Sequence, residues 1–148
     1  MTVHIESPLG FVADFPEHTL VLEGSSAGPN SEQYGLLGDV LVTIIKDDTS
    51  VQGAAQANGW AHLMSEFYLE ERKGTRLAEG ELNIPGRSAY AVLVGYPDAG
   101  GSARVAASVG TWEDNRFIGV LVIWPYVNPE IEPRVELLKE IVSSIRPA

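Results

Sequence analysis

The sequence contains no cysteine. Disulfide bonds, thiolate nucleophiles and cysteine-ligated zinc sites are therefore excluded. The lack of cysteine fits a reducing compartment. The N-terminus has neither the basic region nor the long apolar region of a signal peptide. We therefore expect a cytoplasmic protein, provided that residue 1 is the native start.

Basic residues are also scarce, and no Lys or Arg precedes Lys46. The formal net charge is −10; residues 1–74 carry 11 acids and 3 bases, and residues 75–148 carry 9 acids and 7 bases. A nucleic-acid partner requires a basic patch, so none is expected. Binding to an anionic membrane surface is disfavoured for the same reason. The excess of acid fits a solubilising surface, and a basic partner is the alternative.

Long apolar runs are missing as well. A membrane-spanning helix needs about 18 or more apolar residues. The longest apolar stretch, residues 117–127, is interrupted by Gly119 and Pro125. We therefore predict no membrane insertion. The length of 148 residues and the hydrophobic fraction of 45% predict one globular domain over residues 1–148.

Short apolar runs separated by Gly, Pro and Asp predict mainly β-structure. The early strands are expected at 3–5 and 11–15, which form a hairpin, and at 19–22 and 39–45. The later strands form an antiparallel meander over 76–84, 87–96, 103–112 and 117–124. Residues 24–31 are rich in Gly and Ser and predict a flexible loop.

Two helices are expected. The first follows the capping residues 47–50 and runs to about Arg72. The second begins between Pro129 and Pro133. The predicted core-facing stripes are Ala57, Trp60, Leu63, Met64 and Phe67 in the first helix, and Ile131, Val135, Leu138, Val142 and Ile145 in the second. These elements predict an α+β fold, a twisted antiparallel sheet of about six strands with helices packed on both faces.

Four segments carry a family resemblance: residues 10–16 with their closing Phe-Pro, the Pro-Gly hairpin 82–87, the hairpin 112–124, and the closing helix that ends at 141–146. With the order of elements, they resemble the Mog1/PsbP-like fold and, within it, DcrB-like proteins and the chaperones of secreted type VI effectors. Relatives usually have a Trp soon after the Phe-Pro, whereas Glu17, His18 and Thr19 follow here. The resemblance implies an α/β/α sandwich and a non-catalytic binding role, and it supplies no active-site residues.

The residues themselves carry no catalytic motif and suggest no cofactor. His4, His18 and His62 lie far apart and form no His-x-x-x-His pair, so no metal site is expected. Asp47 and Asp48 are explained by a helix N-terminus, which favours negative charge. No Gly-x-Ser-x-Gly motif occurs. We therefore do not predict an enzyme.

Aromatic residues give the best candidates for partner binding: Trp112, Phe117, Trp124 and Tyr126. They lie on one predicted hairpin and its exit. Both faces of the strand 117–124 are apolar, which favours a central strand covered on both sides. The alternative is an exposed aromatic groove for an apolar ligand or helix. Ala and Gly on the neighbouring strands leave room on one face for a tightly packed helix or for something bound.

The expected function is a non-enzymatic protein-binding module, chaperone-like for a partner with exposed apolar segments. One alternative is an acidic, immunity-type inhibitor of a basic enzyme. Another is a small-ligand binder or enzyme whose pocket lies between the sheet and the first helix, near His62 or Tyr68. A homodimer formed through an edge strand is also open.

Overall fold

A computed structural model describes residues 2–22, 30–46, 51–126 and 132–148. The early strands are β1 (Thr2–Glu6), β2 (Phe11–Pro16), β3 (Leu20–Leu22), β4 (Ser31–Leu36) and β5 (Val40–Ile45). The later elements are α1 (Ala54–Glu70), β6 (Thr75–Glu81), β7 (Ser88–Pro97), β8 (Ala103–Glu113), β9 (Arg116–Pro125), α2 (Glu132–Ser144) and β10 (Arg146–Pro147).

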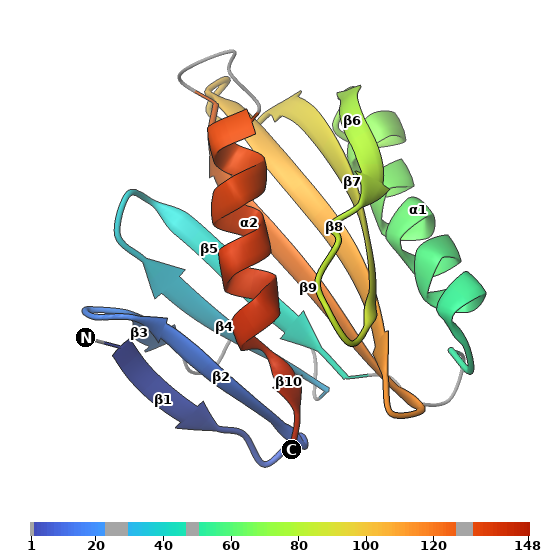
Figure 1. Ribbon diagram of the computed structural model, residues 1–148. Coiled ribbons are helices and arrows are strands. Elements are labelled where there is room, and N and C mark those ends of the chain that lie inside the picture. The colour runs from blue at the N-terminus through green and yellow to red at the C-terminus, as the bar shows by residue number, and fades with distance from the viewer. Residues whose placement is uncertain (1, 23–29, 47–50, 127–131) are drawn as a thin grey trace.

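The strands form two sheets rather than one sheet of about six strands (Figure 1). The larger sheet has seven strands in the order β3-β4-β5-β9-β8-β7-β6, and the smaller has three in the order β1-β2-β10. The predicted N-terminal hairpin is therefore real, but it belongs to the smaller sheet. The sequence prediction missed β4, and the predicted loop 24–31 lies largely outside the described residues.

The predicted meander is confirmed, because β6 to β9 pair in sequence order with antiparallel registers. Asp114 and Asn115 connect β8 to β9, and both have positive φ, as a type I′ hairpin turn requires. Gly86 has a φ of 84° after Pro85, which agrees with the predicted Pro-Gly turn.

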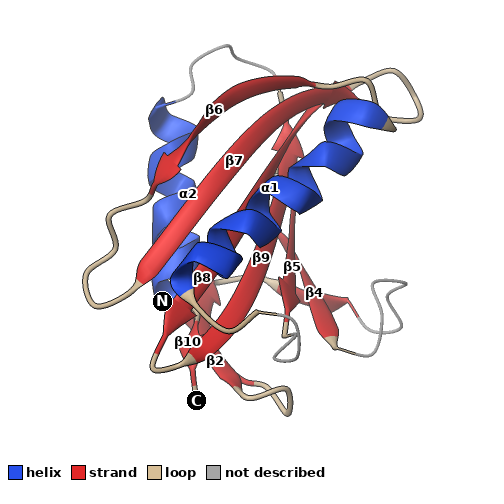
Figure 2. Ribbon diagram, turned by 90° about the vertical axis from the view of Figure 1, so that its right-hand side faces the viewer, coloured by secondary structure: helices blue, strands red, loops and turns tan. Residues whose placement is uncertain are grey.

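Helix α1 covers one side of the large sheet and contacts β7, β8 and β9 (Figure 2). It begins at Ala54, and its N-cap is Gly53 without a side-chain hydrogen bond. The predicted capping residues 47–50 lie outside the described residues. The predicted apolar stripe is confirmed at Ala57 and in part at Trp60, which packs on Phe117, but it was wrong at Leu63 and Phe67, which are exposed. The buried residues of this helix are Ala57, Ala61, Ser65 and Tyr68. Small side chains dominate this interface.

The opposite side of the large sheet packs against α2 and the smaller sheet together, so the second cover is only partly helical. Leu138, Val142 and Ile145 are buried there, as the sequence predicted, and Val135 is half-buried. The predicted stripe residue Ile131 lies outside the described residues. Phe11, Ala13 and Phe15 of β2 are fully buried in the same core. In the described part of the chain, no helix is long and apolar enough to span a membrane.

Candidate protein-binding face

The surface that α1 leaves uncovered begins at β9 and β5. In their antiparallel register, Leu41 lies opposite Ile123, and Ile45 lies opposite Gly119. Directly opposed residues share one face of a sheet. The Trp60 indole of α1 packs over Gly119, so this face is the α1 side. Leu41, Ile45, Leu121 and Ile123 are only half-buried.

Strands β4 and β3 extend this surface to the edge of the sheet. Gly35 lies opposite both Leu41 and Leu20, and Gln33 lies opposite Leu22. Leu20 is 64% exposed and Leu22 is 37% exposed. The Gln33 side-chain amide donates to Thr43 Oγ1 at 3.0 Å. The surface is therefore apolar along β3, β5 and β9, with one internally satisfied polar pair.

One flank of α1 contributes the wall beside this surface. Trp60 contacts the Phe117 ring edge-on at a centroid distance of 5.2 Å, which fixes this flank on the β9 side. Leu63 and Phe67 follow on the same flank by helical spacing and are 64% and 46% exposed. We call the set Leu20, Leu22, Leu41, Ile45, Leu63, Phe67, Leu121 and Ile123 the open face. Figure 2 shows β5 and β4 extending beyond α1.

Close approach of α1 explains why its large side chains lie on the flank. A Cβ on Gly110 would lie 2.0 Å from the Ala57 carbonyl oxygen. A Cβ on Gly119 would lie 2.5 Å from the Trp60 ring. The backbone of α1 thus occupies the space that the small residues of β8 leave open. Only small side chains of the helix fit between its backbone and the sheet. The Gly lining on this side is filled by the helix.

The four aromatic residues predicted as a partner surface do not share one surface. Phe117 and Trp124 are 0% and 1% exposed, so both are core residues on opposite sides of β9. Trp112 packs beside Phe117 on the α1 side. Tyr126 packs on the other side, over Gly95. The structure contradicts the exposed aromatic groove as an arrangement of these four residues, because alternate strand positions face opposite ways.

The predicted lining of Ala and Gly is likewise divided between the two sides. Ala89, Ala91 and Ala107 belong to the core beneath α2, whereas Ala106 and Gly110 lie beneath α1. The open face was missed by the sequence prediction, since its leucines looked like ordinary core positions. The sequence did contain one signal for the open face: the helix segment carries a stripe of large apolar residues and, beside it, a second stripe of small residues that could pack on the sheet instead.

A polar cluster occupies the other flank of α1. Glu79 accepts a hydrogen bond from the Tyr90 hydroxyl at 2.7 Å and lies 3.2 Å from His62 Nε2 and 3.4 Å from Arg76. The bond from Tyr90 lowers the pKa of Glu79, with a smaller contribution from Arg76. Each group is partnered within the cluster, which is consistent with a link between α1, β6 and β7.

A pocket of about 220 Å³ lies at the C-terminal end of α1 and includes Phe67, Tyr68, Tyr96 and Ile123. Burial raises the pKa of the Tyr68 hydroxyl to about 12. Tyr68 lines this pocket, whereas His62 lies on the opposite flank of α1 beside Tyr90 and Glu79, so the two polar groups named for the small-ligand alternative do not line one pocket. No group of three or more potential metal ligands occurs within the described ranges.

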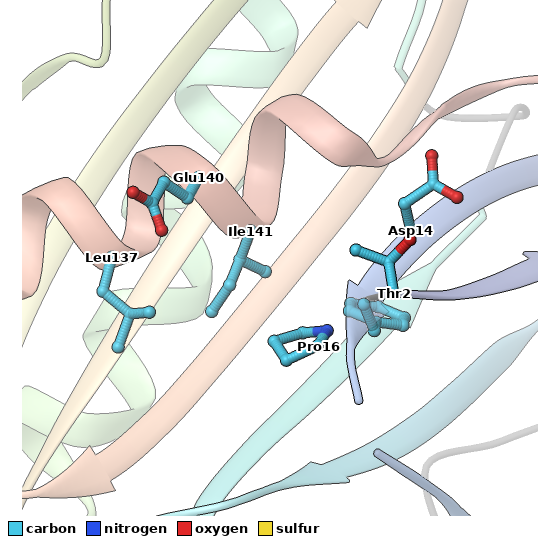
Figure 3. Close-up of a pocket in the computed structure, with 7 residues that line it drawn as sticks. Thr2, Asp14, Pro16, Leu137, Glu140 and Ile141 are labelled. Atoms are coloured by element: carbon cyan, nitrogen blue, oxygen red, sulfur yellow. The ribbon is translucent and has the colours of Figure 1, made fainter. Parts of the chain in front are cut away.

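A second pocket, of about 310 Å³, lies between the smaller sheet and α2 (Figure 3). Leu137 and Ile141 project from α2 toward Pro16. Its polar residues are Thr2, Asp14 and Glu140, and none of the described residues that line it is Lys or Arg. Asp14 accepts a hydrogen bond from His4 at 2.8 Å, which raises the pKa of His4. The pocket is apolar with an acidic rim.

Comparison with known proteins establishes the fold. The chain has the Mog1/PsbP-like α+β fold. The Ran-binding protein Mog1p of Saccharomyces cerevisiae superposes with a TM-score of 0.67 at 10% identity, over 99% of this chain and 95% of that one. Cyanobacterial PsbP of Synechocystis gives 0.60 at 10% identity, over 99% and 92%. A Bacteroides thetaiotaomicron protein gives 0.56 at 10% identity, over 98% of this chain and 48% of its own.

No protein-family model matches the sequence, and no curated protein matches it either. At 10% identity, the structural matches define the arrangement of elements and carry no residue of any site.

Proposed function

We propose that this protein is a non-enzymatic binding module that holds an apolar segment of a partner protein on the open face. The observation that carries this proposal is the gathering of exposed apolar side chains. Among the described residues, seven large hydrophobic side chains are exposed, and Leu20, Leu22, Leu63 and Phe67 belong to the open face. Contiguous exposed apolar surface of this kind is typical of interaction sites.

The shape of the open face favours an elongated apolar segment. It is bounded by the flank of α1 and continues over β9, β5 and β4 to β3. A partner helix or strand lying on it could therefore contact both the α1 flank and the strands. Mog1p, which has the same fold, is a Ran-binding protein, and the fold is therefore compatible with protein binding. Membership of the DcrB-like or effector-chaperone families would fit this role and belongs to the proposal.

Selection of peptides from a random displayed library tests the proposal directly. We expect the purified protein to enrich peptides with several large apolar residues. Leu63→Glu combined with Phe67→Glu should weaken the selected peptides by about tenfold or more, because a charge would be buried in the contact. Thermal unfolding should change little, since both side chains are already exposed.

Leu37→Glu provides the matched control. Leu37 is 72% exposed and follows β4, outside the open face. It introduces one negative charge, against two in the double variant, at a position outside the proposed contact, so peptide binding should remain. Equal loss of binding in the control and the test variant would contradict the proposal, as would selection of no peptides at all.

A second candidate function is recognition of a basic protein, the inhibitor-like alternative. The acidic rim of the pocket in Figure 3 supports it, because Asp14 and Glu140 line an apolar floor and none of the described lining residues is Lys or Arg, although His4 hydrogen-bonds Asp14. A Lys or Arg side chain suits such a site, with its stem on Ile141 and its charge at the rim. Asp14→Asn with Glu140→Gln should then slow association with a basic partner, and salt should abolish the difference.

A further inference from the structure

The outer edge of β3 is a row of backbone groups with no strand beside it in the described part of the chain. β3 pairs only with β4, through Leu20, Val21 and Leu22. All three side chains are exposed and none is charged. Unpaired edge strands of this kind are templates for the addition of another strand.

The opposite edge of the same sheet is protected. β6 carries Arg76, Glu79 and Glu81, and its register with β7 shifts between Arg76 and Ala78. Charged side chains and bulges are the usual means by which proteins prevent pairing at an edge. β3 has only three residues, which limits the length of any pairing, but it lacks the charged side chains and the bulge that protect β6.

Charge determines which strand would pair there. No Lys or Arg occurs before Lys46, so neither β3 nor its neighbour β4 carries a positive charge. Glu17 lies in the turn before β3, and Glu32 of β4 accepts hydrogen bonds from Ser7 and Tyr34. Pairing of two β3 edges would bring two acidic regions together, which opposes a symmetric dimer. A segment with Lys or Arg would instead complement this region.

We propose that the β3 edge binds an extended, basic segment of a partner protein by antiparallel strand addition. Alternate apolar side chains of the added strand would continue the open face beside Leu20 and Leu22, because neighbouring residues across a pair share a face. The remaining, basic side chains would lie on the side of Val21. This inference rests on the proposed function and names its binding mode and partner chemistry.

Three synthetic peptides test the inference by fluorescence anisotropy with the full chain. The first is fluorescein-labelled Lys-Val-Lys-Ile-Lys-Val; the second replaces each Lys by Glu. The third is the basic peptide with alternate backbone nitrogens methylated, which removes main-chain donors along one edge but keeps its charge and apolar side chains. We expect the basic peptide to bind more tightly than both others, by about tenfold or more.

Val21→Lys is the matched variant, with Leu37→Lys as its control. Val21 is 55% exposed and lies on the sheet side opposite Leu20 and Leu22, so the change protects the edge without entering the open face. It should weaken the basic peptide by about tenfold, whereas Leu37→Lys, with the same charge, should weaken it by less than about threefold. Circular dichroism establishes that both variants fold.

Equal binding of the methylated peptide would overturn strand addition in favour of simple electrostatic attraction. Equal effects of Val21→Lys and Leu37→Lys would overturn the assignment to β3. If sedimentation shows a wild-type dimer that Val21→Lys dissociates, the occupant is a second copy and the proposal is wrong. If the Leu63→Glu and Phe67→Glu variant no longer binds the library peptides but the Val21→Lys variant still does, the proposed function holds and strand addition at β3 is wrong.

Discussion

Gly110 and Gly119 are the residues whose missing side chains allow α1 to approach the sheet. The Ala57 carbonyl and the Trp60 ring occupy the positions that two Cβ atoms would otherwise take. Neither glycine has the positive φ that would make glycine necessary for backbone reasons. Their role is therefore steric, and it is specific to the packing of this helix.

Gly110→Ala should destabilise the protein by about 1–3 kcal/mol, because the new methyl group meets backbone atoms of α1 and the helix must shift. Gly59→Ala is the control, since that position lies in α1 with no atom within 4 Å of an added Cβ. It should stabilise the helix by up to about 1 kcal/mol. Urea unfolding measures both changes, and the same sign for the two variants would contradict this account.

At the scale of elements, the sequence predicted the hairpins and the meander well, because Pro-Gly and Asp-Asn turns have local signals. It placed the buried face of α1 correctly at Ala57 but misassigned Leu63 and Phe67, because apolar periodicity favours large residues. The face actually chosen depends on the glycines of distant strands, which no local pattern on the helix reveals. The open face could not be predicted for the same reason, and β4 was missed because its apolar alternation is weak.

The end of α2 is held by Arg87, which follows the Pro-Gly turn between β6 and β7. Its guanidinium donates to the Val142 carbonyl at 2.8 Å and to the Ile145 carbonyl. Burial lowers the pKa of Arg87, but the group stays charged and complements the negative end of the helix dipole. This single side chain joins the large sheet to the helix on its far side.

Arg87→Met should therefore destabilise the protein by about 1.5–3 kcal/mol, since two charge-assisted hydrogen bonds are lost. Arg76→Met makes the same substitution at an exposed ion pair with Glu79 and should cost less than about 1 kcal/mol. Urea unfolding of the two variants and the wild-type protein measures both losses of stability. Similar losses in both variants would mean that Arg87 contributes no more than a surface charge.

For the whole molecule, the tyrosines set an upper pH limit on stability. The pKa of Tyr68 is raised to about 12 by burial, and those of Tyr34 and Tyr96 are raised chiefly by burial as well. A raised phenol pKa means that the folded state holds the neutral form while the unfolded chain ionises near pH 10. This contribution is fully present below pH 10 and is lost as the pH rises toward 12.

Thermal unfolding at pH 9 and pH 11 tests this linkage. The wild-type midpoint should fall between these values, and Tyr68→Phe should show a smaller fall, because its ring remains buried without an ionisable group. Loss of lysine protons makes the net charge more negative in both proteins, so the difference between their slopes isolates Tyr68. Identical slopes would show that Tyr68 ionises as readily in the folded protein as in the unfolded chain, and that the packing of α1 on β7 admits water there.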